Sequence, residues 1–209
     1  MRWLPVLLLT TSQAMAESIG SPCDGSLTNG VRLVPDGQSF GVYSTSGRTW
    51  GHPLLVSALR GALQDVSKPR AKIIVNELSA QSGGEVPGHG YHESGRDVDI
   101  GFPQTVEGVP SAPMYVAFDG DGVSRSDPRR AIDFPRLAAL ILGIDDRARI
   151  REIVLGESLT KRLLEELPAR HRVRAAFTLP KTGARPHDNH IHVQISCPAN
   201  ERRCEETCR

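Results

Sequence analysis

The sequence predicts an α+β domain with a small, mostly antiparallel sheet flanked by helices and long loops. Segments with strand-like alternation are mixed with segments of helical periodicity, without the regular strand-helix-strand rhythm of a parallel α/β fold. No internal repeat is visible. The 193 residues that follow a leader-like segment are enough for one domain with a substantial core, and too few for two.

The first segment has the layout of a secretory signal peptide. Arg2 is followed by an apolar run over 3–9 and by the small-residue sequence Ala-Met-Ala at 14–16. The apolar run is too short to remain as a membrane-spanning helix, so no membrane span is expected. We therefore expect residues 1–16 to be cleaved off, and residues 17–209 to form a single exported domain.

The charge balance of the mature chain gives no sign of a nucleic-acid or anionic membrane partner. Without Arg2, the basic and acidic side chains number 24 each. Proteins that bind nucleic acid or anionic lipid through electrostatics carry an excess of positive charge. Neither kind of partner is expected here.

Export would place the four cysteines where disulfides persist. There is no CxxC pair, so a cysteine zinc site is not expected. Four cysteines allow three pairings, and the sequence alone does not choose among them. We favour a short loop closed by Cys197 and Cys204, and a bridge between Cys23 and Cys208 that joins the two ends of the chain.

The segment after the leader is polar and rich in glycine and serine. Short apolar pieces at 31–34 and 40–43 predict two strands around a turn at 35–37. Residues 37–41 also match GxSxG, which would make Ser39 the nucleophile of a serine hydrolase. That motif requires a strand that runs into a helix, and the residues after 41 do not look helical, so a plain turn is favoured.

The middle of the chain alternates between helices and strands. Pro53 opens a helix that ends before Lys68 and Pro69, and a buried helix is predicted over 134–142. Core strands are predicted over 71–78 and 150–155, and Ser158 is predicted to cap an amphipathic helix. Residues 103–128 are predicted to form a long loop that serves as a wall of a substrate groove.

Two windows of the sequence carry most of its potential chemistry. They span residues 88–100 and 185–197, and five of the seven histidines fall within them: His89, His92, His187, His190 and His192. The first window also contains three glycines, which allow tight turns around a site but are weak support by themselves.

Both windows end in strands whose polar residues alternate with apolar ones. On a strand, residues two apart share a face, so His190 and His192 point one way, as do Asp97 and Asp99. If the two strands lie together, His92, Asp99 and His192 converge on one point. Three nitrogen or oxygen ligands with an open position for water are what a catalytic zinc ion requires.

The two windows resemble the two signature blocks of the penicillin-insensitive murein endopeptidases, which belong to the wider lysostaphin and D-Ala-D-Ala metallopeptidase group. The blocks are His-Gly-Tyr-His-Glu-Ser-Gly-Arg-Asp-Val-Asp at 89–99 and Pro-His-Asp-Asn-His-Ile-His-Val at 186–193. The resemblance is close in these blocks and loose elsewhere. It implies a peptidase that cuts bacterial cell-wall peptides, and the favoured cysteine pairing also resembles that family.

The resemblance also implies roles for individual residues. His92, Asp99 and His192 would bind zinc, and His190 would be the catalytic histidine beside them. His89 and His187 match further site histidines, with His89 a candidate metal ligand and His187 a candidate proton relay. No match is found for the aspartate and histidine that bind an additional metal between the two blocks, so one zinc ion is expected rather than two.

Together with these features, the resemblance implies a periplasmic enzyme that uses zinc to hydrolyse the D-Ala to meso-diaminopimelate cross-link of peptidoglycan. Such an enzyme has no acylated serine and would be insensitive to penicillin. Asp97 is expected to orient a ligand imidazole. The alternatives are a D-Ala carboxypeptidase on the same scaffold, a non-catalytic murein-binding module, and the hydrolase based on Ser39.

Overall fold

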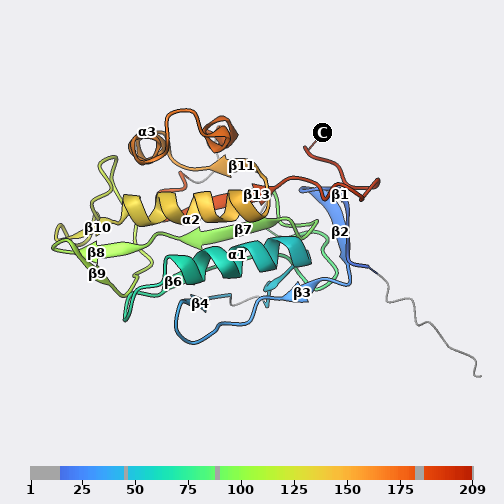
Figure 1. The fold of residues 1–209 in the computed structure, drawn as a ribbon, viewed down its shortest axis with the longest axis horizontal. Helices are drawn as coiled ribbons and strands as arrows, with labels where there is room; N and C mark the ends of the chain where they lie inside the picture. The colour runs from blue at the N-terminus through green and yellow to red at the C-terminus, as the bar shows by residue number, and fades with distance from the viewer. Residues whose placement is uncertain (1–14, 45–46, 88–89, 182–185, 209) are drawn as a thin grey trace, which may run out of the picture.

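A six-stranded sheet forms the centre of the computed structural model, which describes residues 15–44, 47–87, 90–181 and 186–208. The strand order is β12-β11-β13-β7-β6-β4 (Figure 1). The edge strands β4 and β12 run parallel to their neighbours, and the other pairs are antiparallel. The predicted α+β class with a mostly antiparallel sheet is therefore confirmed. The bounds are β4 (Phe40–Val42), β6 (Ile73–Val75), β7 (Asp97–Gly101), β11 (Ile150–Val154), β12 (Phe177–Thr178) and β13 (His190–Ile195).

The α-helices of the described residues are α1 (Pro53–Asp65), α2 (Phe134–Arg147) and α3 (Glu157–Glu166). Figure 1 shows α1 and α2 side by side over the sheet, and α3 packs against α2. A Cβ atom on Gly143 would lie 3.1 Å from the Cβ of Ala62, so this glycine allows α1 and α2 to approach closely. A short 3-10 helix, Arg172–Ala176, leads into β12.

The helix starts follow local capping chemistry. Nδ1 of His52 accepts a hydrogen bond from the N–H of Leu54 at the start of α1. At the start of α2, the carboxylate of Asp133 accepts one from the N–H of Arg136. The predicted cap at Ser158 is wrong: Gly156 precedes the first turn of α3 and makes no side-chain cap.

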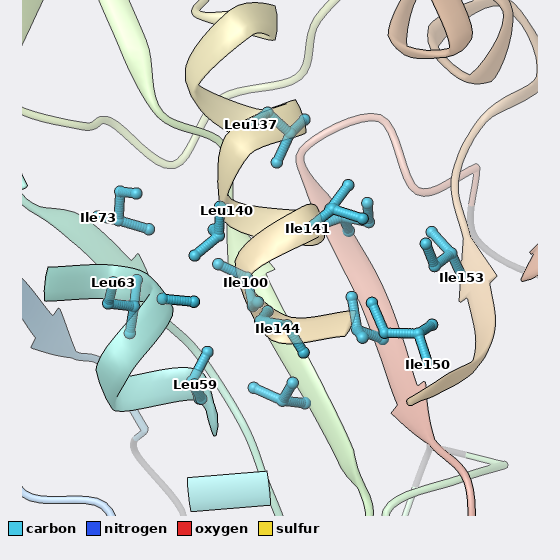
Figure 2. Close-up of a cluster of buried hydrophobic side chains, with 14 of the residues drawn as sticks. Leu59, Leu63, Ile73, Ile100, Leu137, Leu140, Ile141, Ile144, Ile150 and Ile153 are labelled. Carbon is cyan, nitrogen blue, oxygen red and sulfur yellow. The ribbon is translucent and has the colours of Figure 1, made fainter. Parts of the chain in front are cut away.

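Apolar side chains from both helices and sheet form one core. Figure 2 shows leucines of α1 and leucines and isoleucines of α2 gathered against isoleucines from the strands. In β7 and β13 the core residues are Val98, Ile100, Ile191, Val193 and Ile195, all 0–1% exposed. Because side chains alternate along a strand, the intervening polar residues of β7 and β13 lie on the opposite face of the sheet.

Several predicted boundaries are wrong, each for a local reason. The helix predicted to end at 142 continues to Arg147, because Ile144 keeps the apolar spacing and is fully buried. The strand predicted over 71–78 is limited to β6. The N–H of Asn76 donates to the carbonyl of Asp99, and the N–H of Asp99 donates to the carbonyl of Glu77. Asn76 and Glu77 therefore both lie opposite Asp99, and this bulge ends the regular pairing of the strands.

The segment predicted as a long loop contains regular structure. Strands β8 (Gln104–Val106) and β9 (Val109–Ser111) form a hairpin, which pairs with β10 (Arg130–Ile132) in a second sheet. Pro110 within β9 is the reason that the sequence did not predict a strand there. The Gln104 side chain accepts from the N–H of Met114 and donates to its carbonyl, which holds the chain after the hairpin.

The two ends of the described chain lie together (Figure 1). An N-terminal hairpin, β1 (Glu17–Ser21) and β2 (Asp24–Thr28), contacts the C-terminal tail, and a small two-stranded sheet pairs β3 (Val31–Arg32) with β5 (Trp50–Gly51). Cys23 is bonded to Cys208 and Cys197 to Cys204, which is the favoured pairing.

A buried arginine joins the hairpin, the sheet and the tail. Arg96 is fully buried, and its guanidinium donates to the hydroxyl of Ser18 and to the carbonyls of Ile195 and Glu205 at 3.1, 3.1 and 2.6 Å. The residue directly precedes β7, so this network fixes the start of the strand that carries Asp97 and Asp99. None of the helices in the described parts of the chain is long and apolar enough to cross a membrane.

Candidate metal centre

Strands β7 and β13 bring the two histidine-containing windows together. They pair antiparallel in a register that places His192 opposite Asp99, His190 opposite Gly101 and Gln194 opposite Asp97. The histidines and aspartates lie on the face of the sheet that points away from the helices. The juxtaposition expected from the alternation of the sequence is therefore present in the structure.

His92, Asp99 and His192 form a buried cluster on this face. Each offers one ligand atom, and these atoms lie within 4.8 Å of one another. Oδ1 of Asp99 is 3.0 Å from Nδ1 of His192 and 3.4 Å from Nε2 of His92. Two imidazole nitrogens and one carboxylate oxygen fit the first coordination sphere of zinc. Across the described residues, no other group of histidines, cysteines and acids meets this criterion.

The electrostatics of the cluster also fit a cation. Burial works against a charged imidazole, but the interactions of His192 with the carboxylates of Asp97 and Asp99 outweigh it and raise its pKa to about 10. The pKa of Asp99 lies well below its usual value despite burial, because His92 and His192 stabilise its charged form. With protein groups alone, a proton thus provides the positive charge that a divalent cation would supply.

Asp97 lies behind the cluster and is fully buried. Its Oδ1 is 3.3 Å from Nε2 of His192, on the opposite side of the ring from Asp99. A carboxylate beside Nε2 favours the tautomer that carries its proton on this nitrogen, and Nδ1 is the atom of the ring that faces Asp99. This position is compatible with the orienting role expected for Asp97, which stays a prediction.

The loop that presents His92 is held in an unusual conformation. His92 has φ +76°, in the left-handed region that bulky residues rarely adopt, and His187 has φ +50°. The next residue, Glu93, accepts a hydrogen bond from the N–H of Gly25 through its carboxylate and donates its own N–H to the carbonyl of Pro22. The N-terminal hairpin therefore supports the loop, and strain of this kind is typical of functional sites.

His190 lies beside the cluster. Its Nε2 is 3.8 Å from Oδ2 of Asp99, and its Nδ1 is 2.6 Å from the side-chain oxygen of Asn189. An amide oxygen only accepts, so Nδ1 carries the proton and Nε2 keeps a lone pair directed at the cluster. Burial lowers the pKa of His190 to about 4, so its ring is neutral at pH 7. The His187 ring is 4.9 Å from the His190 ring.

Other expected site residues have different outcomes. His89 lies outside the described residues. Ser39 precedes β4 in a turn in which the Asp36 carboxylate accepts the N–H groups of Gln38 and Ser39. Among the described residues, the element that comes next after β4 is the strand β5, so the strand-to-helix turn that a GxSxG nucleophile requires is not seen there.

Two residues near the cluster were not expected from the sequence. The ring of Tyr91 packs 5.0 Å from that of His192, and Asn189 fixes the tautomer of His190. In the sequence, each residue directly precedes a predicted site histidine, His92 or His190. Neither residue type indicates a metal site by itself, so only the geometry identifies them.

A groove with a volume of about 420 Å³ adjoins this region. The segment predicted as a groove wall contributes Phe118, Asp119, Gly120 and Arg125 to its lining. Pro186 and Asp188, the two neighbours of His187, also line it. The groove therefore reaches the segment that leads into β13.

Comparison with known proteins agrees with the resemblance seen in the two blocks. Residues 18–113 match the family model described as penicillin-insensitive murein endopeptidase. A penicillin-insensitive murein endopeptidase of Klebsiella pneumoniae is 26% identical over 205 residues, covering 91% of this chain and 70% of its own length. One from Escherichia coli is 26% identical over 200 residues, with the same coverage. The chain is therefore related to the penicillin-insensitive murein endopeptidases.

Proposed function

We propose that the chain is a zinc-dependent peptidase that hydrolyses the D-Ala to meso-diaminopimelate cross-link of peptidoglycan and is insensitive to penicillin. The observation that carries the proposal is the buried cluster of His92, Asp99 and His192 beside a neutral His190. The names of the related proteins supply the substrate class. The leader-like segment at 1–16 and the two disulfides support a periplasmic location.

His92, Asp99 and His192 would hold the zinc ion, and Asp97 would keep His192 in the tautomer that leaves Nδ1 free for the metal. When bound, zinc supplies Lewis acidity toward the scissile carbonyl and lowers the pKa of water. One ion is proposed, because the described residues contain one cluster of this kind.

His190 would act as the general base. Its neutral ring accepts a proton from the attacking water at Nε2 and then delivers that proton to the leaving amine. The hydrogen bond to Asn189 keeps the lone pair of Nε2 directed at the cluster throughout. His187, with its ring 4.9 Å away, is placed to relay protons to solvent. The proposed chemistry uses no serine nucleophile, so a β-lactam would have no residue to acylate.

The products from purified cross-linked muropeptide dimers test the proposal. Mass spectrometry should show dimers converted to monomers, in the presence of penicillin as in its absence, and no conversion after chelation. Release of free D-Ala with intact dimers would instead identify a carboxypeptidase. Binding to sacculi without any new product would indicate a murein-binding module, and activity lost on Ser39→Ala but retained after chelation would indicate a serine hydrolase.

A further inference from the structure

Tyr91 and Lys181 lie together at the edge of the candidate metal centre. The Tyr91 ring packs 5.0 Å from the His192 ring, and Nζ of Lys181 lies 5.5 Å from the centre of the Tyr91 ring. An ammonium group at this distance is attracted by the electrons of the aromatic face. Tyr91 therefore holds a positive charge close to a proposed metal ligand.

Lys181 also belongs to the lining of the groove. Its neighbours there include Pro186 and Asp188, which flank His187, and the His187 ring is 4.9 Å from that of His190. Lys181 is thus related to the site in two independent ways, through Tyr91 to His192 and through the groove to His187. It lies where the groove meets the proposed catalytic histidines.

The acidic side chains of the groove have partners of their own. Asp188 pairs with Arg125 at 3.5 Å, and Glu157 pairs with Lys161 at 2.8 Å. Oδ1 of Asp119 accepts the backbone N–H groups of 121 and 123 at 3.0 and 2.8 Å. In the part of the chain that the structure describes, no carboxylate lies within ion-pair distance of Lys181. Its charge is available for an anionic group of a ligand.

We propose that Lys181, positioned by Tyr91, binds the free carboxylate that lies next to the scissile amide of the substrate. The inference rests on the proposed function. In a cross-link to the D-centre of meso-diaminopimelate, the carbon that bears the scissile nitrogen also bears a carboxylate. A cation beside the metal centre pairs with that group through a charge-assisted hydrogen bond, whereas an amidated cross-link offers no charge. Lys181 is thus a specificity-determining residue and Tyr91 a positioning residue.

Two muropeptide dimers that differ only at this carboxylate test the assignment, one with the free acid and one with the carboxamide. Wild-type protein should cleave the free acid with a kcat/KM at least about tenfold higher, the effect expected of one charged hydrogen bond. Lys181→Gln should reduce this preference to near unity, and Lys181→Arg should keep most of it. Lys68→Gln, a change of an exposed lysine outside the groove lining, is the matched control and should keep the full preference.

Variants of Tyr91 separate positioning from folding. Tyr91→Phe keeps the aromatic face and should keep the preference, whereas Tyr91→Leu should reduce it while zinc content stays at the wild-type level. Equal cleavage of the two dimers by wild-type protein, or a preference that survives Lys181→Gln, would overturn the inference and leave the proposed function intact. If neither dimer is cleaved, the proposed function is wrong and the inference fails with it.

Discussion

His190 and His192 stand two residues apart on one face of β13, but their surroundings change their pKa values in opposite directions. Burial lowers the pKa of His190 to about 4 and outweighs the attraction of Asp99, whereas the contacts with Asp97 and Asp99 raise the pKa of His192 to about 10. His192 is therefore suited to lie beside a cation or a proton, and His190 to accept a proton. The two roles arise from neighbours and not from residue type.

Substitution of the two histidines should separate their roles. His192→Ala should lose both zinc and activity, because it removes a proposed ligand. His190→Ala should retain zinc at the wild-type level and lose at least about 100-fold in kcat, the range expected for a general base. Metal analysis and dimer cleavage measure the two effects. Loss of zinc in His190→Ala would assign this residue to the metal instead.

Asp97→Asn should weaken zinc binding without abolishing it. The carboxylate at 3.3 Å from His192 sets the orientation of the ring, and loss of such an orienting group typically costs 10- to 100-fold in metal affinity. Competition with a chromophoric chelator measures the affinity. Asp127→Asn, which changes a partly exposed acid paired with Arg129, is the control. Unchanged affinity in Asp97→Asn would show that Asp97 does not orient His192.

Among the elements, β7 and β13 were predictable because their alternation has one interpretation. A period of two with buried valine and isoleucine fixes which side chains share a face, and the structure keeps that assignment. The pairing of the two strands and the place of Tyr91 and Lys181 were not predictable from periodicity, since they depend on contacts between distant segments. The hairpins β1–β2 and β8–β9 were missed because they contain few apolar residues.

The turn before β4 should make stability depend on pH in a narrow acidic range. Burial alone would raise the pKa of Asp36, but hydrogen bonds from the backbone of Gln38, Ser39 and Phe40 lower it to about 2. Because the pKa of Asp36 is lower in the folded state than in the unfolded state, its carboxylate stabilises the fold at pH values above the ordinary pKa of aspartate. This stabilisation is lost as the pH falls through about 2. Wild-type protein should therefore gain in melting temperature over Asp36→Asn between pH 2 and pH 4. A constant difference across this range would contradict the role of the carboxylate.

At the scale of the whole molecule, the disulfide that joins the two ends of the chain helps to hold the loop that carries His92. Cys23–Cys208 joins residues 185 apart in sequence, and the hairpin beside it holds the loop that carries His92. A cross-link that closes a long loop restricts the unfolded chain more than one that closes a short loop. The bridge between the chain ends is thus expected to matter both for stability and for the placement of a proposed metal ligand.

Removal of the two disulfides should have unequal effects. Replacing Cys23 and Cys208 by serine should lower the free energy of unfolding by up to about 5 kcal/mol. The same change at Cys197 and Cys204, seven residues apart, should cost up to about 2.5 kcal/mol. Urea denaturation of both variants measures the difference. Equal losses, or a larger loss for the short loop, would contradict the role assigned to the closure of the chain ends.

The most direct measurement is the recovery of cross-link cleavage when zinc is added back to chelated protein. Because His92, Asp99 and His192 form one site, dimer cleavage should be absent without metal and should rise linearly to a plateau at one zinc ion per chain. Asp99→Ala should show no recovery at that ratio. Cleavage by protein shown to contain no metal, or full recovery in Asp99→Ala, would contradict the account.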